Sequence, residues 1–306
     1  MLLITRGSRG RRVAALLLVL AVGATAWAFG TRAGGSEPGA AHAAAPSPAE
    51  LDELGRKPPI YALVYSWGPE KERIATAQQR LITTCMARKG FTYRAAPVAA
   101  AGETDIPRPR PFGVETLETL EPPADEATES LPPEQPRSEA FTRALFGDQD
   151  DTVSVKGRYV DVSQPSTGCQ AEAEKRLLGD GRLRWLTLRL RLGEGEKESL
   201  SGLDRDRAFR TVTARWRSCM AHAGFEAESP VRLLKALPAG TEVRTHPAVR
   251  ADVRCKADTD YLPTAYSRLA ALQQRWLDAH PDVLADRTAL FLRQQSAADR
   301  VLGTRP

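Results

Sequence analysis

A seven-residue pattern occurs twice in the chain, and it limits the fold more than any other feature. CMARKGF spans residues 85–91 and CMAHAGF spans residues 219–225. Each copy follows apolar residues spaced three and four apart, which is the spacing of one helical face. These apolar residues are Ile74, Leu81, Ile82, Cys85 and Met86 for the first copy, and Phe209, Val212, Trp216, Cys219, Met220 and Ala223 for the second. The pattern predicts two helices, each with a cysteine on its buried face.

The glycine in each copy predicts how these helices end. A helix often ends with a left-handed glycine at position C′, and the residue after that glycine then contacts the residue at C3. Both copies fit this rule, with C′, C3 and C″ filled by Gly90, Met86 and Phe91 in the first and by Gly224, Met220 and Phe225 in the second. The repeated pattern is therefore a helix-stop signal.

Each repeated cysteine is followed by a further cysteine that is predicted to open another helix. Cys169 and Cys255 both stand in the sequence Cys-x-Ala. Four cysteines in an exported chain indicate disulfides, and they allow three connectivities. The repeat favours Cys85 with Cys169 and Cys219 with Cys255. The spacings match no zinc-ligand pattern, so we expect no metal site.

The N-terminus resembles an export signal. Four arginines precede an uncharged apolar stretch over residues 13–30, and Ala26-Trp27-Ala28 meets the small-x-small requirement of a signal peptidase. We expect residues 1–28 to be a cleaved signal peptide or an uncleaved membrane anchor, because eighteen apolar residues are near the minimum for a span. The protein is thus expected to be secreted or extracytoplasmic, with membrane contact only through this segment.

The charge of the chain argues against nucleic acid as a partner. Residues 1–28 hold four arginines and no acidic residue, so without them the formal net charge falls from +5 to +1. Phosphate binding requires a surplus of Lys and Arg on one face. We expect an envelope protein or a wall polymer as the partner.

Two segments of low apolar content divide the rest of the chain. Residues 29–58 are rich in Ala, Gly, Pro and Ser, which predicts a flexible linker. Residues 94–140 contain nine prolines, and residues 113–140 carry eight acidic residues against one basic residue. This composition predicts a solvated, acidic loop inside a helical extracytoplasmic domain over residues 59–306, with repeat halves at about 67–177 and 204–262.

Two further helical regions are predicted. GRLRWLTLRLRLG at residues 181–193 fits a strand or a helix by period, and we favour a helix whose arginines Arg182, Arg184, Arg189 and Arg191 form a hydrated face. From Tyr266 onward the apolar spacing is helical, and DAHP at residues 278–281 interrupts it. The expected fold is mainly α, with two disulfide-linked helical repeats and a C-terminal helical hairpin.

An ordered set of motifs resembles an exported protein family of actinomycetes. The set consists of CMARKGFTY, RPFG at residues 110–113, AFTRALFGD at 140–148, GCQAEAEKRL, WRSCMAHAGF and VRCKAD. The resemblance runs from about Trp67 to the C-terminus and implies a helical protein that is secreted or associated with the envelope. It implies no activity, so no catalytic residue is carried over. The chain departs from the family in lacking a Gly-Tyr-Gly element in its middle loop.

The sequence contains no recognised catalytic pattern. GxSxG, HExxH, Walker, Rossmann and EF-hand patterns do not occur, and four histidines are present. We therefore expect a non-enzymatic binding or accessory module of the envelope without a cofactor. The alternative is an extracellular hydrolase with an unrecognised carboxylate site, whose catalytic residues the sequence does not name.

Overall fold

The computed structural model describes residues 46–101, 108–120 and 138–303, and in this part the protein is mainly helical, as predicted. The predicted signal or anchor, part of the linker and residues 102–107 and 121–137 of the predicted loop lie outside the described residues. The elements are α1 Pro48–Arg56, α2 Pro59–Tyr65, α3 Pro69–Arg88, η1 Glu118–Leu120, α4 Glu139–Phe146, β1 Thr152–Lys156, β2 Asp161–Pro165, α5 Gly168–Leu178, η3 Gly179–Gly181, α6 Arg182–Leu203, α7 Arg207–His222, α8 Pro230–Lys235, α9 Pro247–Asp258, α10 Tyr261–Ala279 and α11 Pro281–Leu302.

Local sequence sets where most of these helices begin. Proline is the first residue of α1, α2, α3, α8, α9 and α11, a position where its missing N–H is not needed. Side-chain oxygens of Ser47, Ser138, Asp206 and Ser229 accept backbone N–H groups at four helix N-termini. The chain therefore carries its own start signals, independent of tertiary packing.

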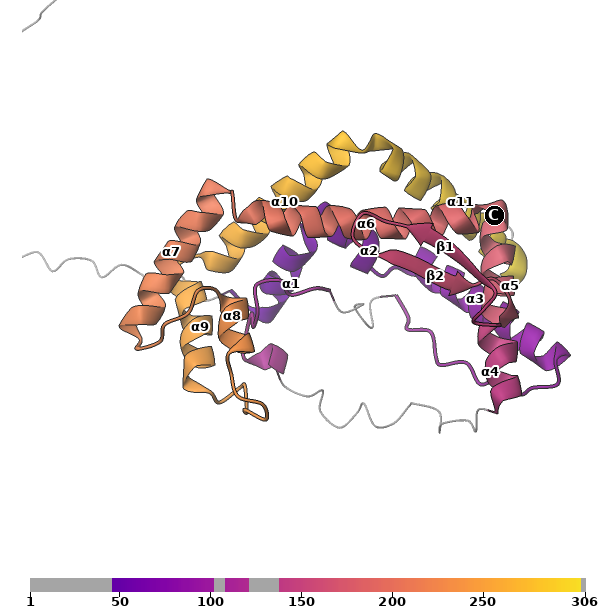
Figure 1. Cartoon of the computed structure of the whole chain (residues 1–306), viewed down its shortest axis with the longest axis horizontal. Coiled ribbons are helices and arrows are strands. Elements are labelled where there is room, and N and C mark those ends of the chain that lie inside the picture. Colours follow the sequence, from indigo (N-terminus) through magenta and orange to yellow (C-terminus); the bar gives the residue numbers. More distant parts are fainter. Residues whose placement is uncertain (1–45, 102–107, 121–137, 304–306) are drawn as a thin grey trace, which may run out of the picture. The chain divides into compact units, whose positions relative to one another are not determined.

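Long α6 connects the two disulfide-linked helix pairs. In Figure 1, α6 extends from the region of α7 and α9 to the region of α3 and α5, and both C-terminal helices contact it. One apolar cluster unites α7, α9 and α10, and two others unite α3 with α4, α5 and α11. A fourth cluster lies between these, with residues of α2, α6 and α11. The predicted C-terminal helix pair is thus present, and each of its helices also packs on other elements.

The two disulfides join the cysteines that the repeat paired. Cys85 is bonded to Cys169 and links α3 to α5, while Cys219 is bonded to Cys255 and links α7 to α9. The described part of the chain contains no free cysteine. Two such bonds are typical of a protein in an oxidising environment.

Both copies of the seven-residue pattern end their helices with the hydrogen bonds of the Schellman motif. The Phe91 N–H donates to the Met86 carbonyl at 3.0 Å, and the Phe225 N–H donates to the Met220 carbonyl at 2.9 Å. The glycines between them have φ of 81° and 84°, values that a residue with a Cβ rarely adopts. Cys85 and Cys219 consequently lie one turn before a fixed helix end.

The prediction that Cys255 opens a helix is wrong. Helix α9 begins at Pro247, where the His246 side chain accepts the Ala248 N–H, so Cys255 lies near the helix end. Cys169 does lie in the first turn of α5. The two Cys-x-Ala sequences therefore occupy different positions in their helices. Cys255 lies late in α9 because Pro247 starts this helix two turns earlier.

The predicted linker reaches too far into the domain. Residues 48–56 form α1, and Leu51 is 3% exposed in the apolar cluster of α7, α9 and α10. Ser47 and Glu50 complete a capping box at its start. Leu51 and Leu54 supply the apolar face that the Ala- and Pro-rich composition around them obscured.

Two strands were not predicted, whereas the helix over residues 182–191 was predicted correctly. β1 and β2 form an antiparallel hairpin in which Val155 pairs with Val162. The alternating valines on both sides of Gly157 were the signal that could have identified it. The leucines of α6 alternate along the sequence as in a strand, although the segment is a helix. Leucines of this helix pack against several other helices, so its apolar residues are not confined to one helical face.

No helix in the described ranges has both the length and the apolarity needed to cross a bilayer.

Candidate functional site

Five of the residues at positions 108–116 are buried, so the prediction of a solvated loop is wrong for this segment. Its buried members are Arg108, Phe112, Val114, Glu115 and Thr116, with exposed fractions of 3–9%. The Phe112 ring lies edge-on to the Tyr266 ring with centroids 4.9 Å apart. The proline-rich and acidic composition of the loop predicted that it would be solvated. Composition cannot show that each buried charge has a partner elsewhere in the chain.

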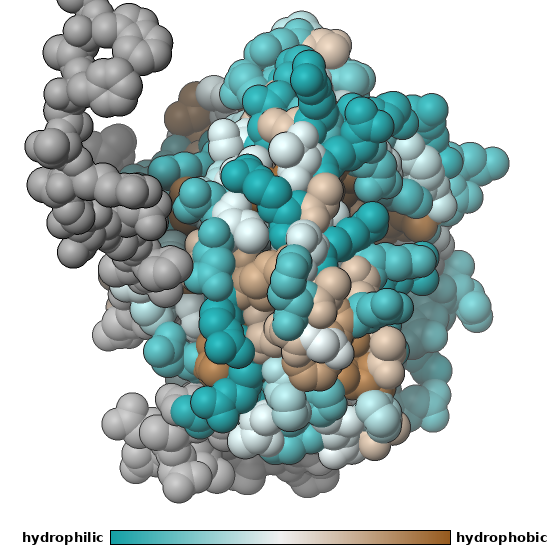
Figure 2. Space-filling model, turned by 90° about the vertical axis from the view of Figure 1, so that its left-hand side faces the viewer, coloured by the Kyte–Doolittle hydropathy of each residue, from teal (hydrophilic) through white to brown (hydrophobic). Residues whose placement is uncertain are grey.

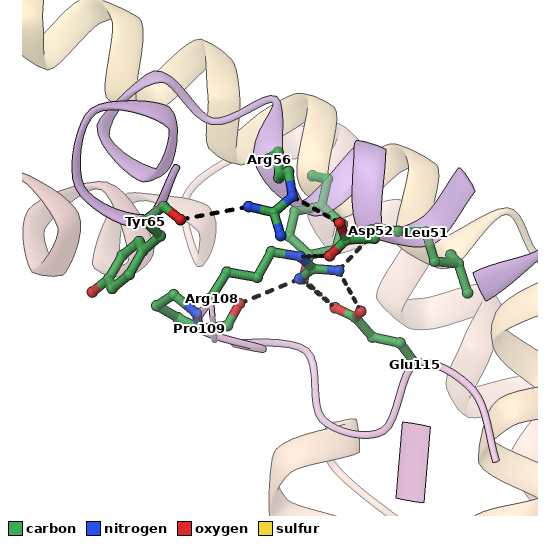
Figure 3. Close-up of polar contacts among 8 residues, drawn as sticks. Leu51, Asp52, Arg56, Tyr65, Arg108, Pro109 and Glu115 are labelled. Atoms are coloured by element: carbon green, nitrogen blue, oxygen red, sulfur yellow. Dashed lines mark hydrogen bonds and ion pairs between the residues drawn. The ribbon is translucent and has the colours of Figure 1, made fainter. Parts of the chain in front are cut away.

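Arg108 is the centre of a polar network beneath α1. Its guanidinium donates to Glu115 through two nitrogens at 3.1 and 2.7 Å, and to Asp52 at 3.0 Å (Figure 3). It also donates to the Leu51 carbonyl and the Tyr266 hydroxyl. A bidentate fork of this kind is the strongest form of ion pair in proteins. The network fixes residues 108–116 to α1 and α10.

The Tyr266 hydroxyl completes this network by donating to Glu115. Burial and the negative charge of Glu115 raise the pKa of Tyr266, so the hydroxyl stays protonated. Both carboxylate oxygens of Glu115 accept hydrogen bonds, and its side chain is 1% exposed. Every group in this network is engaged with another.

A second buried ion pair lies beside the first. The Lys256 ammonium donates to Asp252 at 2.7 Å and to the Val114 carbonyl at 2.6 Å. Asp252 also accepts the indole N–H of Trp216 at 3.0 Å, and its side chain is fully buried. This pair joins α7, α9 and the buried segment, next to the Cys219–Cys255 disulfide.

A cavity of about 360 Å³ adjoins both ion pairs but offers few unengaged groups. Its walls include Leu51, Glu115, Lys256, Asp260 and Leu262. Glu115 and Lys256, the buried charges in the wall, are already paired. The two networks are therefore better explained as supports of the fold than as a ligand site.

The Arg108 guanidinium lies directly against Gly55 of α1, which gives a stability prediction. A Cβ at Gly55 would lie 1.8 Å from the Arg108 Cζ. We expect Gly55→Ala to displace the guanidinium and lower the free energy of unfolding by about 2 kcal/mol, measured by urea denaturation. Gly193 in α6 has no atom within 4 Å of its Cβ position. Gly193→Ala is the control and should raise stability by about 0.5–1 kcal/mol.

A different cavity, also of about 360 Å³, lies between α2, α3, α5, α6 and α11. Aromatic and aliphatic side chains form most of its walls, among them Leu63, Trp67, Ile74, Trp185, Leu188 and Phe291. Three cations also line it, namely Lys71, Arg189 and Arg287. We call this cavity, defined by these nine residues and Gln294, the cationic pocket.

The cations of the cationic pocket lack acidic partners. Among the described residues, no carboxylate forms an ion pair with Arg189 or Arg287, and burial lowers the pKa of Arg287. The Arg287 guanidinium lies over the Phe291 ring at 4.5 Å. Glu174, the acid in the pocket wall, is paired with Arg182 at 2.6 Å. The pocket therefore holds positive charge that the described part of the fold does not neutralise.

A buried amide faces the same pocket. Gln294 is 8% exposed and lines the pocket, and its side-chain amide makes no hydrogen bond within the described part of the chain. The amide atoms keep contact with solvent, so they can bond to a ligand in the pocket. Arg287, Phe291 and Gln294 are spaced by four and three residues, so they occupy one face of α11.

Lys71 belongs to the fold and to the pocket at once. Its ammonium donates to the carbonyls of Leu63, Val64 and Ser66, which end α2, with the shortest bond 2.6 Å. Burial, followed by the charge of Arg287, lowers the pKa of Lys71 to about 8. The lysine thus stabilises the end of α2 and also adds positive charge to the pocket. The charge of nearby Arg287 disfavours the protonated form of this lysine.

The residues singled out from sequence do not form this site. The four cysteines and the six residues of the two helix-stop signals line neither cavity. Of the four arginines predicted to form a hydrated face, Arg182, Arg184 and Arg191 form ion pairs and Arg189 lines the cationic pocket. The helical spacing of Lys71, Ile74, Ala75 and Gln78 was the signal that could have identified one wall.

The end of the molecule formed by α7, α8 and α9 offers less to a ligand. Figure 2 shows this side as mostly hydrophilic, with a small apolar area. A depression there is lined by Arg217, Glu226, Glu228, Arg232 and Lys235 together with apolar residues. Charges of both signs lie side by side in it, so it favours neither an anion nor a cation.

Comparison of the chain with protein-family models, with curated proteins and with solved structures found no match. No metal-binding cluster of three His, Cys, Asp or Glu residues occurs in the described ranges. The geometry of the cationic pocket is therefore the main support for a binding function.

Proposed function

We propose that this chain is exported and acts outside the cytoplasm as a non-enzymatic binding or accessory module of the cell envelope. The cationic pocket carries the proposal, because it combines a preformed apolar cavity with cations that form no ion pair, and with a side-chain amide that makes no hydrogen bond, in the described part of the chain. A bound anion would supply the counterion that these cations lack.

The two disulfides support the proposed location. Disulfides form and persist in oxidising compartments and are rare in the cytosol. The arginine-rich, apolar N-terminus is the expected export signal, and the likeness to an exported actinomycete family stays a prediction beside it. We propose an envelope component as the ligand. Nucleic acid is disfavoured, because the formal net charge of residues 29–306 is near neutrality.

The alternative of an extracellular hydrolase has less support. Glu115, Glu118 and Asp260 line the cavity beside Arg108, as a carboxylate site would require. Glu115, however, accepts hydrogen bonds from Arg108 and Tyr266 on a side chain that is 1% exposed. Its use as an acid or nucleophile would break the ion pair that holds residues 108–116 in place. We therefore favour binding over catalysis.

The test is recovery of the protein from its own source cells. We expect it in the medium or the envelope fraction, with both disulfides formed and with a small molecule retained in native mass spectrometry. Variant Arg287→Gln should lose that extra mass and Arg300→Gln, on the exposed face of the same helix, should keep it. Recovery in the cytosol with four reduced cysteines would refute the proposal.

A further inference from the structure

We propose that the cationic pocket binds a small amphipathic anion, with its carboxylate or phosphate head against Arg287 and Gln294 and its apolar body between Trp67, Trp185 and Phe291. This inference rests on the proposed binding function and names the chemistry of its ligand.

The head of the ligand is assigned by the polar groups of α11. Arg287 and Gln294 lie on one face of this helix, and neither forms an ion pair or side-chain hydrogen bond with another described residue. A guanidinium offers several N–H donors in a plane, which matches the oxygens of a carboxylate or phosphate. Arg189, from α6, adds a second guanidinium to the same pocket. A cationic or uncharged head would leave this positive charge unpaired.

The apolar body is assigned by the opposite wall. Trp67 is held in place because its indole N–H donates to the Ala99 carbonyl at 3.1 Å. Trp185, Leu188 and Leu192 recur at helical spacing on α6, and Ile74 faces them from α3. A free inorganic anion would leave these walls in water. A wall of this composition instead gains from burying an alkyl or aromatic group, by about 25 cal/mol for each Å² covered.

Lys71 makes the binding depend on pH in a defined direction. The charged groups around it are Arg287 on α11, Arg189 on α6 and Glu174 on α5, and Glu174 is paired with Arg182. Burial and Arg287 lower the pKa of Lys71 to about 8. A bound anion favours the protonated lysine, so binding takes up a proton near this pH. We expect the affinity to fall as the pH rises above 8.

The experiment is isothermal titration of the full mature chain with decanoate and with decyl phosphate, below their micelle concentrations. We expect one site per chain, with quenching or enhancement of tryptophan fluorescence because Trp67 and Trp185 line the pocket. Decanol and decyltrimethylammonium share the tail and lack the negative charge, so they should bind at least about tenfold more weakly. Equal binding of the four compounds would overturn the proposal.

Three variants separate this site from non-specific binding. Arg287→Gln should weaken decanoate binding about tenfold or more, and Gln294→Leu should weaken it less. Arg300→Gln, at an exposed position of α11 outside the pocket, should bind as the unmodified chain does. Arg287→Gln should also keep or raise the thermal unfolding midpoint, because it removes a half-buried charge that has no acidic partner. Unchanged binding by Arg287→Gln would refute the assignment.

Vesicles distinguish the two sources of such an anion. Co-sedimentation with phosphatidylglycerol vesicles, absent with phosphatidylcholine and lost in Arg287→Gln, would identify a membrane lipid headgroup as the source. Binding of the monomeric decyl anions without co-sedimentation would identify a free amphiphile. If neither occurs while the protein from its source cells retains another small molecule, the ligand class is wrong and the proposed binding function stands.

Discussion

Replacing Asp252 by asparagine is expected to lower the free energy of unfolding by about 3–5 kcal/mol, because it leaves the Lys256 charge without its counterion in the core. Lys256 is 1% exposed and Asp252 is fully buried. The substitution keeps the size of the side chain, so the effect reports charge instead of packing. Urea denaturation followed by circular dichroism measures it.

A matched control exists elsewhere in the chain. Arg143 and Glu139 also lie four residues apart on a helix, with the same separation of 2.7 Å, but their side chains are 65% and 86% exposed. Glu139→Gln should change stability by less than about 1 kcal/mol, because solvent already screens this pair. Similar losses in the two variants would show that burial does not set the energetics of the Asp252 pair.

The pH dependence of the Asp252→Asn variant gives an independent check. Burial lowers the pKa of Lys256 below its unfolded value, so the unfolded chain binds more protons between the two values. Removing the Asp252 carboxylate lowers that folded-state pKa further, so the stability of the variant relative to the unmodified chain should recover as the pH rises from the folded-state pKa of the variant towards that of the unmodified chain. A deficit that grows over this interval would mean that Lys256 is not the buried charge responsible.

Removing the Cys85–Cys169 disulfide is the second large effect. The chain-entropy estimate is about 4.6 kcal/mol for this disulfide, whose cysteines are 84 positions apart, and about 3.8 kcal/mol for Cys219–Cys255, whose cysteines are 36 positions apart. We expect the paired variants Cys85→Ala/Cys169→Ala and Cys219→Ala/Cys255→Ala to lose about 2–5 kcal/mol each, since native relaxation reduces the estimate. Equilibrium urea unfolding under non-reducing conditions measures both.

Reduction provides the control for the disulfide variants. Dithiothreitol should destabilise the unmodified chain, and it should not affect a variant that lacks all four cysteines. Each half also has other support: Arg88 on α3 pairs with Glu172 on α5, and Trp216 on α7 bonds to Asp252 on α9. A loss below about 1 kcal/mol in either paired variant would show that these contacts suffice without the covalent bond.

Much of the fold was available from the sequence where the signal was local. The helix ends at residues 90 and 224 depend on hydrogen bonds within six consecutive residues, so the seven-residue pattern alone predicts them. The cysteine pairing followed from the same repeat. Cys255 and residues 48–56 were misassigned for the opposite reason, because composition and likeness outweighed the local start signals at Pro247 and Ser47.

The candidate site was not available in this way. The cationic pocket is formed by Lys71, Arg189 and Arg287, which lie on three helices far apart in the chain. Each of these residues looks like an ordinary hydrated cation in its own segment. Only their position around one cavity, beside Trp67 and Gln294, gives them a shared role.

The sequence by itself determined the helical class, the helix ends and the partners of the four cysteines, because these follow from interactions between near neighbours and from an internal repeat. The tertiary structure alone decided that Arg108 and Glu115 leave water as a pair, and that three cations line one apolar cavity without forming an ion pair with any described acid. The physical reason is desolvation. Its cost depends on which distant side chains surround a charge, and the order of residues along a chain does not record those neighbours.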